Sequence, residues 1–510
     1  MNSTPPDSTA TPAAPSAAGT AGSVSPPVAA GRRPRTARPL ENALFSAAML
    51  GRRLPWTDAP ARLLGLDALT QEGATRQLLA HLRRSRDGRP VLISTLFGSF
   101  LVPLTPEDTA GLLARGAACA ALGPGTLLTP SGHRRGLYPH TDTPVEALPA
   151  AADIGGLLAD EVRGLLDGRP GGDGIPGRAD WLAWSARAVR RVVVGAAAAE
   201  DRLLSEVLRR AGEAVGRRER DRYDAALMRR LAPYLDEPDP ASVAGRIGAA
   251  LALDAGPAVA HLLAMASRAA GDTAAQALAL LAAEVTDSPA RAVASALHHY
   301  PPVDAVAHPV RTDFVWEGLA VASGTEVLAM PARLRETTAA VPAARAVPGP
   351  PATGEPSPLC GAPTPCAAGA FAARIAEEIV AGIAARSRPV LLAPRIPRDR
   401  LPLRLDPDTL RVALGPVPGP LPGARPADAA VAARAAVTGH GHAPAAYGSL
   451  ASASADLLDR HARDLENCAL HSGWSSDGAG EQFRTVLLGH AERCAQAASD
   501  VRRAARRLSD

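Results

Sequence analysis

The sequence predicts a mainly α-helical fold with small β-sheets, followed by a separate C-terminal helical hairpin. Between about 150 and 300, apolar residues recur at the three- and four-residue spacing of an amphipathic helix. Two shorter stretches, 90–104 and 303–330, are rich in branched side chains interrupted by glycine, which favours short strands. Over 483–508, apolar residues alternate spacings of four and three without a break, which predicts a helix with a seam for a partner helix.

The composition excludes several classes of protein. Of 510 residues, 46% are hydrophobic and 21% charged, the balance of a globular protein. We find no run of about 18 apolar residues without charges, and no basic N-terminal region followed by an apolar run. Five cysteines are too few for a disulfide framework, and the net charge is only +4 with acidic residues interspersed. We therefore expect a cytoplasmic protein that binds neither nucleic acid nor a membrane.

The chain divides into four segments by composition. Residues 1–42 are rich in Ala, Pro and Ser and hold few large apolar side chains, so we expect a disordered tail. An ordered domain over 43–425 follows, whose last part, 389–425, holds many prolines around a strand-like stretch, TLRVAL. A linker rich in Pro, Gly and His spans 426–446, and the helical hairpin occupies 447–510.

Local signals define single elements within the domain. The stretch 90–104 predicts two strands with a turn near Gly98. Thr105 is then a helix cap, because Pro106 and two acidic residues directly after it suit the first helical turn. Gly318 and Gly324 predict turns between short strands.

The C-terminal segment carries the apolar seam. The preceding stretch, with Leu457, Leu458, Leu465 and Cys468, can supply the facing helix, with Trp474 at the turn. The segment loosely resembles the WxG-type helical hairpins of actinobacterial secretion substrates, and a plain helical interaction module is the alternative. The seam is formed by Phe483, Leu487, His490, Cys494, Ala497, Val501, Ala504 and Leu508.

Cysteine is the residue type that most directly suggests chemistry. The sequence has no Gly-rich phosphate loop, no HExxH and no CxxC. Cys360 and Cys366 lie six residues apart in a loop with no histidine at ligand spacing, which argues against a zinc site. Cys366 directly precedes a predicted helix, whose free N–H groups and dipole favour a thiolate. That position suits a metal ligand or a nucleophile, and a small buried apolar residue is the alternative.

The order of features along the chain resembles that of the cytochrome P-450 family, the heme-thiolate monooxygenases. LCGAPTPCAAGAFAARIAEEI is similar to the heme-ligand loop and the helix that follows it. ALHHYPPVDAVAHPVRTDFVWEGLAVASGTEVL is similar to the segment upstream of that loop, and ALALDAGPAVAHLLAMASRA to the oxygen-binding helix. LLTPSGHRRGLYPH resembles the segment that carries an arginine over the heme. The likeness is colinear from about 44 to about 425 and looks actinobacterial in type.

The resemblance implies a fold, a cofactor and residue roles. It implies a cytochrome P-450-like fold with heme bound through Cys366 as the axial iron ligand. Asp254, in the central helix, is the implied catalytic residue for proton delivery. The implied activity is a monooxygenase of secondary metabolism that uses dioxygen, a small organic substrate and electrons from an external ferredoxin or reductase. The implied heme-binding residues are Arg134, Arg135, His308 and Phe371.

Departures from the family pattern leave a second hypothesis open. The E-x-x-R pair falls on Ser295 and His298, so its ion pair is absent. The arginine before the ligand cysteine falls on Thr364, and the threonine of the oxygen-binding helix falls on Val259. The alternative is therefore a catalytically degenerate scaffold or partner-binding protein, with the C-terminal hairpin contributing to a protein interface.

Overall fold

The computed structural model describes most of the chain between residue 31 and residue 509. Two compact units are separated between Val417 and Pro418. The described residues are 31–51, 70–95, 98–128, 134–141, 148–167, 176–250, 255–334, 357–364, 366–396, 401–416, most of 455–470 and 478–509.

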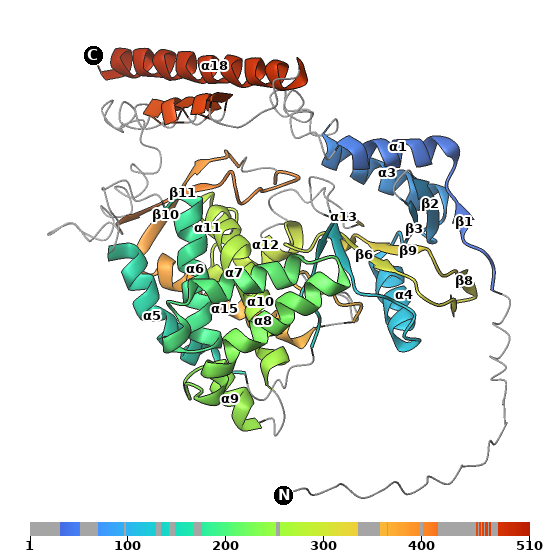
Figure 1. Ribbon diagram of the computed structural model, residues 1–510. Coiled ribbons are helices and arrows are strands. Elements are labelled where there is room, and N and C mark those ends of the chain that lie inside the picture. The colour runs from blue at the N-terminus through green and yellow to red at the C-terminus, as the bar shows by residue number, and fades with distance from the viewer. Residues whose placement is uncertain are drawn as a thin grey trace, which may run out of the picture. The chain divides into compact units, whose positions relative to one another are not determined.

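The first unit is built mainly of helices, which gather in one body beside a sheet (Figure 1). This arrangement confirms the prediction drawn from the helical spacing between 150 and 300. The helices of this body are α5 (Ala151–Asp167), α6 (Arg178–Val193), α7 (Arg202–Glu213), α8 (Arg217–Asp236), α9 (Val243–Ala250), α10 (Gly256–Arg268), α11 (Ala274–Ala282), α12 (Pro289–His299) and α15 (Ala367–Ala384).

Helices α10 and α15 form the centre of this body. Every residue of α10 from Ala258 to Ala266 is buried, as expected for a helix that is apolar on all sides. Helix α15 buries a stripe that includes Phe371, Ile375 and Ile379, and it packs against α5, α10 and α12. The start of α15 therefore lies inside the core, next to α10.

A seven-stranded mixed sheet lies beside the helical body. Its strand order is β1-β2-β3-β9-β6-β4-β5. Strands β2 and β3 pair antiparallel from Val91↔Val102 to Thr95↔Gly98, which confirms the two strands predicted over 90–104. The strands are β1 (Arg35–Thr36), β2 (Val91–Thr95), β3 (Gly98–Val102), β4 (Thr126–Leu128), β5 (Arg134–Gly136), β6 (Val306–Pro309) and β9 (Glu326–Ala329).

Short helices accompany the sheet, and the local signals in the sequence set their ends. Thr105 caps α4, because its side chain accepts a hydrogen bond from the backbone N–H of Asp108. The prediction of a helix start at Thr105 is thus confirmed. The helices are α1 (Pro39–Gly51), α3 (Gln71–Ser85), α4 (Pro106–Ala118) and α13 (Pro331–Leu334).

The predicted turns at Gly318 and Gly324 are also present. Strands β7 (Phe314–Trp316) and β8 (Leu319–Val321) form a hairpin, and Gly318 in its turn has φ +74°. Gly324 has φ +80° just before β9. Only glycine reaches these backbone angles without steric cost, so each fixes a reversal of the chain.

The long central helix is interrupted by one turn of π-helix. Residues Ala269–Thr273 connect α10 to α11 with this wider geometry. The indole Nε1–H of Trp181, on α6, donates a 2.6 Å hydrogen bond to the carbonyl of Gly271. A π-turn leaves carbonyls without their usual helical donor, and Trp181 satisfies one of them.

Two segments differ from the sequence prediction. Residues 31–42, assigned to the tail, hold β1 and the start of α1, because Ala37 and Phe45 find a buried apolar surface against the sheet. Strand β10 (Ser387–Ala393), which contains Pro389 and was not predicted, pairs antiparallel with β11 (Arg411–Pro416). The strand-like TLRVAL overlaps β11, as expected.

The second unit contains α18 (Gly478–Ser509) and a helical stretch within 455–470. Arg502 bonds both Asp456, at 2.8 Å, and Asp459, at 2.5 Å, which joins the two. In α18 the side chains of Cys494 and Val501 are half-buried, whereas Ala497 is less buried than its neighbour Ala498. The turn with Trp474 lies outside the described residues, so the hairpin stays a prediction. The buried apolar residues among the described part of this unit are Ala455, Ala462, Ala469, Ala491 and Ala498, none of which belongs to the predicted seam.

Candidate functional site

Cys366 is the N-cap residue of α15, as the sequence predicts. Its backbone is extended, with φ −113° and ψ 109°, and its carbonyl accepts a hydrogen bond from the N–H of Gly369. The cysteine is 9% exposed and belongs to the main apolar core. Its sulfur therefore lies where the helix dipole stabilises negative charge and where water is excluded.

Helix α10 lies directly over this sulfur. The Nε2 atom of His261 is 3.3 Å from Cys366 Sγ, and Met265 Sδ is 3.5 Å from the same atom. These residues are four apart, so they occupy one face of α10. That face is the one which α10 presents to the start of α15.

Two more donors complete a cluster around Cys366. Cys360 Sγ is 3.8 Å from Nδ1 of His140, which follows β5 in the chain. The rings of His140 and His261 meet edge to face, with centroids 5.1 Å apart. One ligand atom from each of His140, His261, Cys360 and Cys366 lies within 4.8 Å of the others, and all four residues except His140 are buried. We call these four residues the Cys/His cluster.

Hydrogen bonding within the Cys/His cluster sets its charge. The hydrogen bond between the two thiols lowers the pKa of Cys366 and raises the pKa of Cys360. Burial opposes the shift at Cys366, while hydrogen bonds from His140 and His261 reinforce it. Arg268 donates a 2.8 Å hydrogen bond to the carbonyl of Leu359 and adds positive charge close to Cys360. The arrangement favours a thiolate at Cys366.

The sequence missed three members of this cluster. Cys360 is not predicted as a metal ligand from the sequence, because no histidine lies at ligand spacing in its own loop. The structure supplies the histidines from elsewhere, because His261 is 105 residues before Cys366 and His140 is 220 residues before Cys360. No spacing rule reaches over such separations, so the lack of a histidine in the loop of Cys360 and Cys366 does not exclude a metal site.

The two arginines assigned to heme binding are engaged in ion pairs. Arg134 on β5 is 2.8 Å from the carboxylate of Glu326, and its guanidinium lies over the ring of Phe100. Arg135, its neighbour, is 3.4 Å from Glu213. A role toward a heme carboxylate therefore requires them to exchange these partners.

The other assigned residues lie in different environments. His308 on β6 is buried, and burial lowers its pKa to about 4, so the imidazole is neutral at pH 7. Phe371 is buried in the first turns of α15, one helical turn after Cys366. Asp254 lies outside the described residues. Phe371 thus lies on the helix that Cys366 caps, whereas Arg134 and Arg135 contact glutamates.

Replacing Ser295 with alanine is expected to raise the free energy of unfolding by about 1 kcal/mol. Ser295 occupies the position of the missing E-x-x-R glutamate, is fully buried, and its hydroxyl has no hydrogen-bond partner among the described residues. Alanine removes this unsatisfied group and leaves little empty volume. Urea unfolding followed by circular dichroism measures the change. A loss of stability of similar size would mean that the hydroxyl is hydrogen-bonded.

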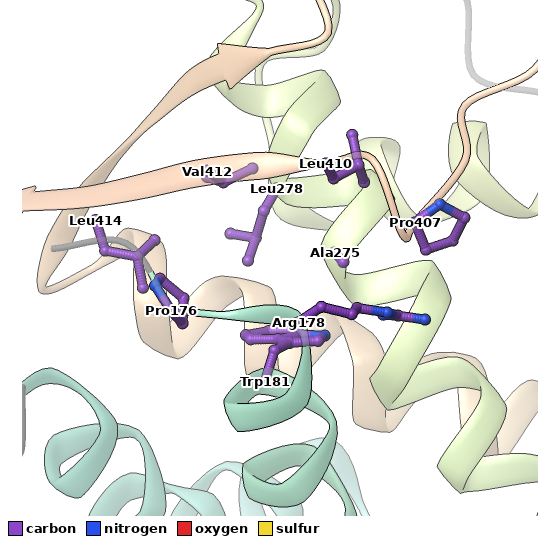
Figure 2. Close-up of a pocket in the computed structure, with 9 residues that line it drawn as sticks. All are labelled: Pro176, Arg178, Trp181, Ala275, Leu278, Pro407, Leu410, Val412 and Leu414. Carbon is purple, nitrogen blue, oxygen red and sulfur yellow. The ribbon is translucent and has the colours of Figure 1, made fainter. Parts of the chain in front are cut away.

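A small cavity lies apart from the Cys/His cluster. Its volume is about 40 Å³, which is room for two or three water molecules. Figure 2 shows side chains of α6, α11 and the segment around β11 converging on it. The residues that line it are Pro176, Arg178, Trp181, Ala275, Leu278, Pro407, Leu410, Val412 and Leu414.

Comparison with known proteins identifies the fold. CYP108D1 from Novosphingobium aromaticivorans superposes with a TM-score of 0.50 at 14% identity, covering 75% of this chain and 100% of that chain. Cytochrome P-450 CYP109Q5 from Chondromyces apiculatus gives a TM-score of 0.45 at 15% identity, covering 68% of this chain and 96% of that chain. No protein-family model and no curated protein matches the sequence. The first of these superpositions establishes the fold and confirms the predicted mainly α-helical class with small β-sheets, whereas the added C-terminal hairpin stays a prediction.

None of the described helices combines the length and the apolar character that crossing a bilayer requires.

Proposed function

We propose that this chain, which has the cytochrome P-450 fold, is a heme-thiolate oxidoreductase with Cys366 as the axial iron ligand. The observation that carries the proposal is the place of Cys366, a buried thiol at the N-cap of α15 facing α10. A thiolate-ligated heme supplies activation of dioxygen with electrons from an external donor. We further propose a small organic substrate, a ferredoxin or reductase as donor, and a place in secondary metabolism.

The donor chemistry of the site fits heme iron. A thiolate is the ligand that this type of heme requires, and the helix dipole and the hydrogen bond from Cys360 both favour that form at Cys366. Phe371 contributes apolar surface at the start of the same helix. The space beside the sulfur is filled by His261 and Met265, at 3.3 and 3.5 Å, so heme binding requires these side chains to move aside.

A second candidate function is that of a partner-binding protein with the cytochrome P-450 fold. It is favoured by the environment of the groups proposed to neutralise the heme carboxylates. Arg134 and Arg135 are paired with glutamates, and His308 is neutral. Two heme carboxylates would then lack cations, which weakens binding by about 1–3 kcal/mol for each lost charged hydrogen bond. The proton-delivery role proposed for Asp254 belongs to the heme enzyme alone and has no counterpart in a partner-binding protein.

The carbon monoxide difference spectrum of the reduced, purified protein tests the proposal. We expect a heme-thiolate band in the wild type and in Cys119→Ala, a control at an exposed cysteine that ends α4. In Cys366→Ala we expect that band to be lost. A wild-type protein that takes up no heme after supply during expression would overturn the proposal and leave the partner-binding function.

A further inference from the structure

The Cys/His cluster has the composition and the dimensions of a tetrahedral metal site. Zinc bound by two cysteines and two histidines, with bonds of about 2.3 and 2.1 Å, holds its ligand atoms about 3.4–3.8 Å apart. The distance from His261 Nε2 to Cys366 Sγ is 3.3 Å, and that from Cys360 Sγ to His140 Nδ1 is 3.8 Å. The largest separation within the cluster is at most 4.8 Å. Two donor pairs are therefore already near the spacing of a tetrahedral zinc site, and the widest pair has to close by up to about 1 Å when the metal binds.

We infer that, in the heme-free chain, His140, His261, Cys360 and Cys366 bind one Zn²⁺ ion in a closed Cys₂His₂ site. This zinc site is distinct from the proposed heme binding. An axial heme ligand uses one sulfur, whereas the zinc site also uses Cys360 and both histidines.

Burial supports the inference. Cys360 is 2% exposed and His261 is 1% exposed, and both lie among apolar side chains of the main core. Nδ1 of His261 has no hydrogen-bond partner among the described residues, so the polar contacts of this ring are those of Nε2 toward the cluster. Polar atoms in a core are costly without strong partners, and coordination would supply one for Nε2 of His261 and for the two sulfurs. Two thiolates and one divalent cation also leave the buried site neutral.

The donor set selects the metal. Two thiolates and two imidazoles in a tetrahedral arrangement are typical of zinc, whereas magnesium and calcium take oxygen ligands. All four positions come from the protein, so the site has no open position for substrate and is structural. The metal would link three segments: the one after β5, helix α10 and the loop before α15. Links between segments that lie far apart in sequence reduce the conformational entropy of the unfolded chain most.

Heme and zinc exclude one another because both need the sulfur of Cys366. Zinc holds His261 against that sulfur, whereas heme displaces it. The two proposals can therefore fail separately. Loss of His140 or Cys360 removes zinc binding but leaves the axial thiolate in place.

Zinc content measured on the full-length, heme-free protein by elemental analysis is the test. We expect one zinc per chain in the wild type and in the control variants Cys119→Ser and His81→Ala, whose side chains are exposed. We expect His140→Ala, Cys360→Ser and His261→Ala to lose the metal to a chelator that leaves the wild type loaded. Wild-type protein without stoichiometric zinc, or variants that retain it, would overturn the inference.

X-ray absorption at the zinc edge of the wild type keeps the test independent of how the variants fold. Two sulfur and two nitrogen ligands are expected, and a shell of oxygen ligands or a single sulfur would refute the site. Substitution by Co²⁺ gives a second reading, since a tetrahedral thiolate site shows strong visible bands and a sulfur-to-cobalt charge-transfer band. Absence of a heme band with zinc retained would refute only the heme proposal.

Discussion

Replacing Arg333 with methionine is expected to lower the free energy of unfolding by about 3 kcal/mol. Arg333, on α13, is 4% exposed at its side chain and is 2.6 Å from Asp304 and 3.3 Å from Glu72. Methionine keeps most of the volume but removes the cation that Asp304 contacts, while the neighbouring Arg76 stays paired with Glu72. The Asp304 side chain is only 27% exposed, so it loses its cation in a place where water solvates the charge incompletely, which is costly.

Urea unfolding of Arg333→Met against Arg374→Met measures this difference. Arg374 is 52% exposed and pairs with Glu377 along one helix, so its loss is expected to cost less than about 1 kcal/mol. Adding Asp304→Asn to Arg333→Met is expected to recover part of the stability, because the stranded carboxylate is then neutral. Equal effects of the two arginine variants would show that the contacts of Arg333 contribute no more than a surface pair.

The stability of the protein is expected to fall as the pH drops from about 6.5 to about 4, because His308 resists protonation in the folded state. Burial lowers the pKa of His308 to about 4, against an unfolded value of about 6.5. Between these values the unfolded chain binds a proton that the folded chain does not. The stabilising contribution is therefore fully present above about pH 6.5 and is lost toward pH 4, up to about 3 kcal/mol.

Urea midpoints measured at several pH values test this dependence. We expect His308→Leu, which has a similar volume, to remove most of the fall in stability over this pH range. Its stability is expected to be lower than that of the wild type by an amount that does not depend on pH, since the backbone carbonyl of Gly123 loses the ring as a hydrogen-bond donor. A variant with the wild-type pH dependence would assign it to other groups.

Most of the helical body could be predicted from the sequence, because its signals are local. The cap at Thr105 depends on residues within one helical turn, and the turn at Gly318 depends on one backbone angle. The position of Cys366 before α15 is likewise a matter of a few residues. Strand β10 and the pairing of residues 31–42 were missed, since each depends on a partner strand far along the chain.

The chemistry of the site divides in the same way. The sequence by itself determined that Cys366 begins a buried helix, and that the E-x-x-R glutamate position holds Ser295. Only the tertiary structure decided that His140 and His261 face the two cysteines and that Arg134 pairs with Glu326. Caps and periodicity are fixed by contacts between near neighbours, whereas a ligand set spanning up to 220 residues exists only after the chain has closed those loops.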